Sequence, residues 1–210
     1  MKFNQLVIFR RQFIKNNNTK DHVIINGDKK VLISAPHGVS QVRLGKLKTA
    51  EPGALATALW LRQDNNCYLI AKTKNNNDDV NFDEKSSYKR SIEKLIKEEG
   101  IKYIIDFHGL DPKRDCDVNL GIHLGKNIKT NEKLFNDLYD ALLSNNFVTK
   151  IDAPFMAGCR TISWSMADKF PHVWTLQIEI NCGITNRREN FDKYKKLLNI
   201  LSAWIKTIQV

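Results

Sequence analysis

The chain has 210 residues, of which 42% are hydrophobic and 27% charged, and this composition is typical of a globular protein with a buried core. It argues against a disordered polymer, and no apolar stretch is long enough to cross a bilayer, so we expect no membrane partner. The net charge of +10 raises the alternative of a basic nucleic-acid-binding or accessory domain. The lysines are spread along the whole chain and no binding motif is present, so an ordinary basic surface is preferred and nucleic acid is not expected as a partner. A small anionic substrate would also benefit from this charge.

The first fifty residues predict three strands and no helix. Residues 1–14 lack the small-residue cleavage site of a signal peptide and are interpreted as a strand. Residues 22–26 and 30–35 are β-like runs, and Asn26-Gly27 between them is a strong hairpin signal. A basic loop is expected over residues 39–49.

Strands and helices then alternate along the rest of the chain. We expect helices at residues 54–62, 86–99 and 131–145, a helix opened by a capping box of Asn186 and Glu189, and strands at residues 67–72, 101–107, 118–124, 147–151 and 173–180. This alternation predicts an α/β fold, with a mixed, largely parallel central sheet between two layers of helices. No repeat, linker or change in composition divides the chain, so residues 1–210 are interpreted as one domain.

The last predicted strand has an unusual polar row. Thr175, Gln177, Glu179 and Asn181 alternate with apolar residues and therefore share one face of the strand. Polar groups on a buried strand cost stability unless they serve a site or a hydrogen-bond network. Glu179 lies in sparsely charged surroundings, so partial desolvation would raise its pKa, as a general base requires.

Two histidines follow β-like runs and precede glycine, in Ala35-Pro36-His37-Gly38 and in Asp106-Phe107-His108-Gly109. In open α/β sheets, sites form beyond the carboxyl ends of the strands. A catalytic zinc ion needs three protein ligands and one open position, and His37 and His108 are the best two candidates. Glu51, the first carboxylate after His37, is the leading third ligand, while Asp106 could be a ligand or could orient an imidazole. Each of these residues could also have a purely structural role.

Arginines are the expected partners of a substrate carboxylate, because a guanidinium group pairs with it through two hydrogen bonds. Four arginines fall in or near predicted loops, namely Arg43, Arg90, Arg114 and Arg160. Arg160 ranks first, because it follows a glycine and precedes a short tryptophan-containing segment.

The cysteines give a simple expectation about the cellular compartment. Cys67, Cys116, Cys159 and Cys182 are scattered and form no CxxC pair, so neither a disulfide framework nor a thiolate zinc site is expected. A reducing cytoplasm is the simplest location for such a chain.

Four segments together resemble a known enzyme family. Pro36-His37-Gly38, Glu51-Pro52-Gly53, Asp106-Phe107-His108-Gly109 and Gln177-Ile178-Glu179-Ile180-Asn181, in this order, resemble the N-formylglutamate amidohydrolase family. They are also similar to the phage poly-γ-glutamate hydrolases, within a wider group of zinc carboxypeptidase-like and aspartoacylase-like enzymes. The resemblance implies a phosphorylase/hydrolase-like α/β/α fold.

The resemblance also implies an activity and its residues. His37, Glu51 and His108 would bind one Zn²⁺ ion per chain, and Glu179 would be the catalytic carboxylate that shuttles a proton during cleavage of an amide next to a carboxylate. The compact His-x-x-Glu pair of the carboxypeptidase-like relatives is absent, and no Asn-Arg pair follows Glu51, where Asn81 and Arg90 are loose substitutes. The expected activity is therefore a zinc-dependent amidohydrolase or peptidase acting on a small anionic amide, with a catalytically degenerate family member as an alternative.

Overall fold

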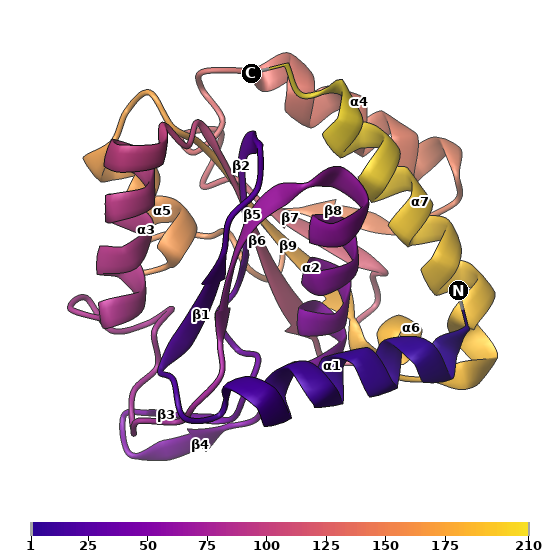
Figure 1. Ribbon diagram of the computed structural model, residues 1–210. Helices are drawn as coiled ribbons and strands as arrows, with labels where there is room; N and C mark the ends of the chain where they lie inside the picture. Colours follow the sequence, from indigo (N-terminus) through magenta and orange to yellow (C-terminus); the bar gives the residue numbers. More distant parts are fainter. Residues whose placement is uncertain (1, 210) are drawn as a thin grey trace.

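In this computed structural model, which describes residues 2–209, the apolar runs that alternate with helices along the chain form a seven-stranded sheet (Figure 1). The strand order is β1-β5-β2-β6-β9-β7-β8. The strands are β1 (His22–Ile25), β2 (Lys29–Ala35), β5 (Cys67–Lys72), β6 (Tyr103–Leu110), β7 (Val118–Gly121), β8 (Thr149–Ile151) and β9 (Trp174–Asn181). The four central strands β5, β2, β6 and β9 run parallel, while β1 and β7 are antiparallel to their neighbours β5 and β9.

Helices cover both faces of this sheet, which confirms the expected three-layer α/β/α architecture (Figure 1). One face packs against α2 (Pro52–Asn65), α4 (Glu132–Ser144) and α7 (Phe191–Thr207), and the other against α3 (Ser87–Glu99) and α5 (Ile162–Lys169). The N-terminal α1 (Phe3–Asn17) packs on α2, and α6 (Cys182–Thr185) with a 3₁₀ turn (Arg188–Asn190) leads into α7. Among the described residues, no helix combines the length and apolarity needed to span a bilayer.

The register of the central strands places the predicted polar residues side by side. Asp106 of β6 lies between Ser34 of β2 and Gln177 of β9, and His108 of β6 is paired with Glu179 of β9. Because side chains alternate along a strand, these residues share the face of the sheet on which α3 and α5 pack. The expected polar row on the last strand is confirmed, and its members are all buried.

Two predictions about the N-terminal region were wrong. Residues 3–17 form a helix rather than a strand, because Phe3, Leu6 and Phe13 recur at helical spacing and turn toward α2, α7 and the core. The expected hairpin of residues 22–35 does not form, since β1 and β2 lie on opposite sides of β5. Gly27 is instead needed where the chain passes the end of α2, because a Cβ atom there would lie 2.4 Å from the carbonyl oxygen of Asn66.

Two further segments differ from expectation. The expected loop of residues 39–49 contains a small hairpin of β3 (Gln41–Arg43) and β4 (Lys46–Lys48), whose turn has positive φ angles at Leu44 and Gly45. The capping box of Asn186 and Glu189 does not open the last helix. The short α6 and the 3₁₀ turn occupy that segment, so α7 begins at Phe191.

Candidate metal centre and cleft

Three buried donor groups converge beyond the carboxyl ends of β2 and β6. His37 follows β2, His108 lies in β6, and Glu51 is the residue that precedes α2. One donor atom from each lies within 4.8 Å of the others. His37 Nδ1 is 3.1 Å from Glu51 Oε1 and 3.1 Å from His108 Nδ1, and His108 Nδ1 is 3.3 Å from Glu51 Oε2. Three residues from separate parts of the chain thus present two nitrogens and a carboxylate to one point.

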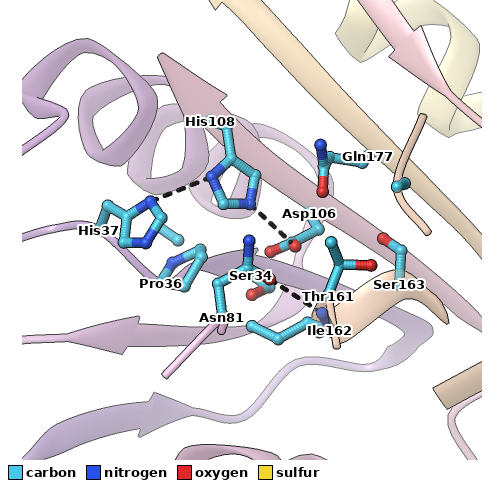
Figure 2. A network of polar contacts seen from close by, with 12 residues as sticks. Ser34, Pro36, His37, Asn81, Asp106, His108, Thr161, Ile162, Ser163 and Gln177 are labelled. Carbon is cyan, nitrogen blue, oxygen red and sulfur yellow. Dashed lines mark hydrogen bonds and ion pairs between the residues drawn. The ribbon is translucent and has the colours of Figure 1, made fainter. Parts of the chain in front are cut away.

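A second carboxylate orients each imidazole. His37 Nε2 donates to Asp79 Oδ1 at 3.0 Å. His108 Nε2 donates to Asp106 Oδ2 at 3.0 Å, as Figure 2 shows. A proton on Nε2 leaves the Nδ1 lone pair of a neutral ring free, and carboxylates of this kind fix the tautomer of metal-binding histidines. Asp106 therefore lies on the far edge of the His108 ring, and Glu51 is the carboxylate within the donor cluster.

The cluster fits a bound cation. In their neutral Nε2–H forms, His37 and His108 direct lone pairs at each other and at Glu51, and these contacts repel unless a positive charge lies between them. Burial lowers the pKa of His108, but Asp106 and Glu51 outweigh this effect and hold its pKa well above the usual range. Burial also raises the pKa of Glu51, yet the two facing imidazoles keep its pKa well below the usual range. The donor set is the one found in catalytic zinc centres.

Glu179 lies next to this cluster. It is 5% exposed, and Gln177 Nε2 donates a hydrogen bond to its Oε1 at 3.0 Å. Burial raises the pKa of Glu179 to about 7, with His108 acting in the opposite direction and Glu51 in the same direction. A carboxyl group with such a pKa can accept and release a proton near neutral pH.

Asp79 is a site residue that the sequence analysis missed. It lies in the polar loop after β5, is fully buried, and accepts hydrogen bonds from His37 and, at 2.7 Å, from Arg43 Nε. Burial raises the pKa of Asp79, but these two partners outweigh it and keep its pKa well below the usual range. One signal was available: β5 is a buried strand parallel to β2, so its following loop must pass the edge that carries His37.

The structure places the other predicted site residues, Arg160, Arg90 and Asn181, in three different surroundings. Arg160 lines the cleft beside the donor cluster. Arg90 lies on the exposed side of α3 and does not line it, because the helical turn points it away from the sheet. Asn181 ends β9 and is the N-cap of α6: its Oδ1 accepts from the backbone nitrogen of Gly183, and its Nδ2 donates to the carbonyl oxygen of Cys116. The structure therefore gives Asn181 the role of a helix cap.

The cleft above the donor cluster has a volume of about 430 Å³. Arg43, Lys48 and Arg160 bring positive charge to its walls, and Lys48 also forms an ion pair with Glu51. Phe82 contacts two of these cations, since the guanidinium carbons of Arg43 and Arg160 lie 5.2 and 4.9 Å from its ring centre. Each of the three cations is also paired with a carboxylate, Arg43 with Asp79, Lys48 with Glu51 and Arg160 with Glu84.

Two loops that form the cleft are tied to each other. Asn81 Oδ1 accepts from the backbone nitrogen of Ile162 at 2.8 Å, an interaction visible in Figure 2. The nearly buried Lys89 of α3 donates to the carbonyl oxygens of Asp83 and Arg160 and so joins both loops. Burial lowers the pKa of Lys89 to about 8, against the opposing effect of Asp106. The cleft walls are therefore held by buried contacts.

Comparisons with known proteins identify the fold. No family model and no curated protein sequence matches the chain. Among solved structures, the gene product Atu2144 from Agrobacterium tumefaciens is similar with a TM-score of 0.64 and 12% identity, over 95% of this chain and 99% of that one. N-formylglutamate amidohydrolase from Ralstonia eutropha JMP134 has a TM-score of 0.59 and 11% identity, over 89% and 97% of the two chains. A bacteriophage poly-γ-glutamate hydrolase has a TM-score of 0.57 and 13% identity, over 92% and 93%. The chain thus shares its fold with these three structures, two of which are named as hydrolases.

Proposed function

We propose that this chain is a zinc-dependent hydrolase that cleaves an amide bond in a small anionic substrate, of the N-acyl amino acid, γ-glutamyl or peptide type. The observation that carries the proposal is the convergence of His37, Glu51 and His108 beside a separate carboxyl group, Glu179. The names of two proteins of similar fold, an N-formylglutamate amidohydrolase and a poly-γ-glutamate hydrolase, support this reaction class.

The metal would be held by two imidazole nitrogens and one carboxylate oxygen. Asp79 and Asp106 keep the Nδ1 atoms of His37 and His108 available for it. When bound, a zinc ion supplies Lewis-acid polarisation of a carbonyl group and makes water more acidic.

The four cysteines are free thiols, which supports our proposal of a reducing compartment such as the cytoplasm.

Glu179 moves the proton in this mechanism. Its carboxylate takes a proton from the attacking water and gives it to the departing nitrogen, so that a C–O bond forms, the C–N bond breaks, and a carboxylic acid and an amine leave. Gln177 fixes one oxygen of Glu179 for this transfer. The cations that line the cleft, Arg43, Lys48 and Arg160, attract the substrate carboxylate, and Arg160 lies on the loop before α5.

The test begins with metal content. Wild-type protein loaded with zinc and dialysed should hold one ion per chain by elemental analysis, and His37→Ala and His108→Ala should lose it. His172→Ala, at an exposed histidine, is the matched control and should keep it. Full zinc content in both His37→Ala and His108→Ala would overturn the metal site.

Turnover is the second part of the test. A panel of N-formyl, N-acyl and γ-glutamyl amides is offered to the zinc-loaded protein, and Glu179→Gln should keep the metal while losing most activity, by a factor of about 10²–10⁴ for one general base. A wild-type protein that binds zinc yet cleaves no member of the panel would contradict the proposed hydrolase.

A further inference from the structure

The cleft has an apolar side that the proposed function does not use. Phe155 and Met156 line it while leaving 44% and 39% of their surface exposed. Both belong to the loop between β8 and α5, and Pro154 and Ala157 continue the same lining. Large apolar side chains exposed in a cleft commonly mark a ligand-binding surface.

The backbone of this loop is fixed, although its side chains are not covered. Phe155 O accepts from Asn119 Nδ2 at 2.8 Å, and Met156 O accepts from the backbone nitrogen of His123 at 2.7 Å. Asn119 Oδ1 also accepts from the backbone nitrogen of Ala153 at 2.9 Å. Both residues are thus held in place through main-chain contacts, and a ligand that covered their side chains would pay little ordering entropy.

The apolar wall, formed by Phe155 and Met156, and Arg43 lie on different sides of the donor cluster. Arg160 belongs to the same loop as the wall, but its guanidinium carbon is 4.9 Å from the ring centre of Phe82, which Arg43 also contacts. Asn119, which holds Phe155, is paired in the sheet with Glu179, so the wall adjoins the proton-transferring carboxyl group. Arg43 reaches the cluster from the other side, where it binds the carboxylate partner of His37. A substrate that spans the cluster therefore meets positive charge at one end and apolar surface at the other.

We propose that Phe155 and Met156 determine specificity by binding an apolar substituent on the amine half of the substrate. The inference rests on the proposed function, in which Glu179 gives its proton to the departing nitrogen and so defines the side on which the amine leaves. The preferred substrates are then amides that join an anionic acyl group to an apolar amine.

Two substrate series test this assignment on the zinc-loaded protein. One series is γ-glutamyl amides of methylamine, butylamine and hexylamine, and the other is N-acylglutamates with formyl, butanoyl and hexanoyl groups. We expect kcat/KM to rise roughly 10-fold from the methylamide to the longer amides, as burial of about two methylene groups allows, and to stay flat along the acyl series. Phe155→Ser and Met156→Ser should each remove most of the rise, so that each variant cleaves the hexylamide little faster than it cleaves the methylamide, while the zinc content stays at one ion per chain. Leu44→Ser, at a 79% exposed leucine outside the cleft lining, is the matched control.

Other outcomes separate this inference from the proposed function. Cleavage with no dependence on the amine, or with a gradient in the acyl series, overturns the assignment of the wall and leaves the hydrolase intact. If no amide in either series is cleaved, the hydrolase is overturned, and calorimetric binding of the methylamide and hexylamide then decides the wall. Tighter binding of the hexylamide that Phe155→Ser abolishes supports an apolar subsite, and equal affinities overturn it.

Discussion

Two buried clusters of charged residues lie next to each other at the carboxyl edge of the sheet, and they differ in one respect. In the first, Lys72 at the end of β5 forms ion pairs with Asp21 and Asp78 and supplies their counter-charge from within the chain. In the second, His37 and His108 turn electron pairs toward each other and toward a carboxylate. The cation of the first cluster is a buried lysine, whereas the facing imidazole nitrogens of the second can be joined either by a proton on His108, whose pKa is raised, or by a metal ion.

The difference separates a structural role from a ligand-binding one. Buried carboxylates are stable when a charged partner and hydrogen bonds satisfy them, as Lys72 does here. Two facing imidazole nitrogens and a carboxylate are instead the donor set of catalytic zinc centres, in which a metal ion takes the place of the shared proton. The contrast is sharpest at two adjacent residues of one loop, since Asp78 faces Lys72 and Asp79 faces His37.

The largest expected effect comes from breaking the first cluster, Lys72 with Asp21 and Asp78, called the Lys72 cluster below. Lys72→Met leaves Asp21 and Asp78 without their shared cation, and we expect the free energy of unfolding to fall by about 3 kcal/mol. This value is at the low end for a broken buried pair, because the two carboxylates are 24% and 25% exposed. Urea unfolding measures the loss, and the zinc content should remain at one ion per chain.

A surface ion pair gives the control for this prediction. Lys193 pairs with Asp117 but is 43% exposed, so Lys193→Met should cost less than about 1 kcal/mol. Equal losses in the two variants would show that the buried lysine has no special role. Loss of zinc in Lys72→Met would show that the two clusters are not independent.

The next effect concerns metal affinity and compares the two adjacent carboxylates. Asp79→Asn removes the charge that orients His37, so the dissociation constant for zinc should rise about 10-fold to 100-fold. Asp106→Asn should act in the same direction through His108. Asp78→Asn, one residue away, faces Lys72 and should leave zinc affinity unchanged while it lowers stability.

Competition with a chelating dye measures these affinities. An Asp79→Asn protein that binds zinc as tightly as the wild type would remove Asp79 from the metal centre. A loss of affinity as large in Asp78→Asn as in Asp79→Asn would mean that the loop acts as a whole.

Sequence patterns were sufficient to find the seven strands of the sheet and two of the three donor residues, His37 and His108. The strands that carry His108 and Glu179 are apolar runs ended by polar residues, and such local signals need no knowledge of distant partners. Glu51 was harder to assign, because its place between the histidines depends on α2 packing across the end of β6. A backbone hydrogen bond from Gly109 to Glu51 Oε2 at 2.9 Å is the contact that brings them together.

Asp79 and the first helix were missed for different physical reasons. Asp79 lies in an aperiodic loop, and its bond to His37 joins residues far apart in the sequence, so no local pattern marks it. The N-terminal segment does carry a helical period, in Leu6 and Phe13, but its β-branched and aromatic residues also suit a strand. Packing on α2 decided between the two. Local propensity is a weak prior where tertiary contacts decide.

The smallest expected effect is the pH dependence of the stability that the Lys72 cluster contributes. Burial raises the pKa of Asp21, but hydrogen bonds from Lys72, Ser87 and His22 outweigh it, and the pKa of Asp21 lies well below its usual 3.8. Just below pH 3.8, the carboxyl group of Asp21 therefore binds a proton more readily in the unfolded chain than in the folded protein. The stability that the ionised Asp21 contributes is complete above pH 3.8 and is lost as the pH falls further.

Asp21→Asn tests this dependence against the wild type. The variant should lose about 1 kcal/mol of stability at neutral pH, where solvent partly screens the pair, and the difference should shrink in urea unfolding measured between pH 4 and pH 2.5. Asp140→Asn, at an exposed position of α4, should change stability little at every pH. A difference between wild type and Asp21→Asn that stays constant down to pH 2.5 would mean that Asp21 contributes through its shape and hydrogen bonds. In that case Asp78 alone would be the charged partner of Lys72, and the Lys72 cluster would be a single ion pair.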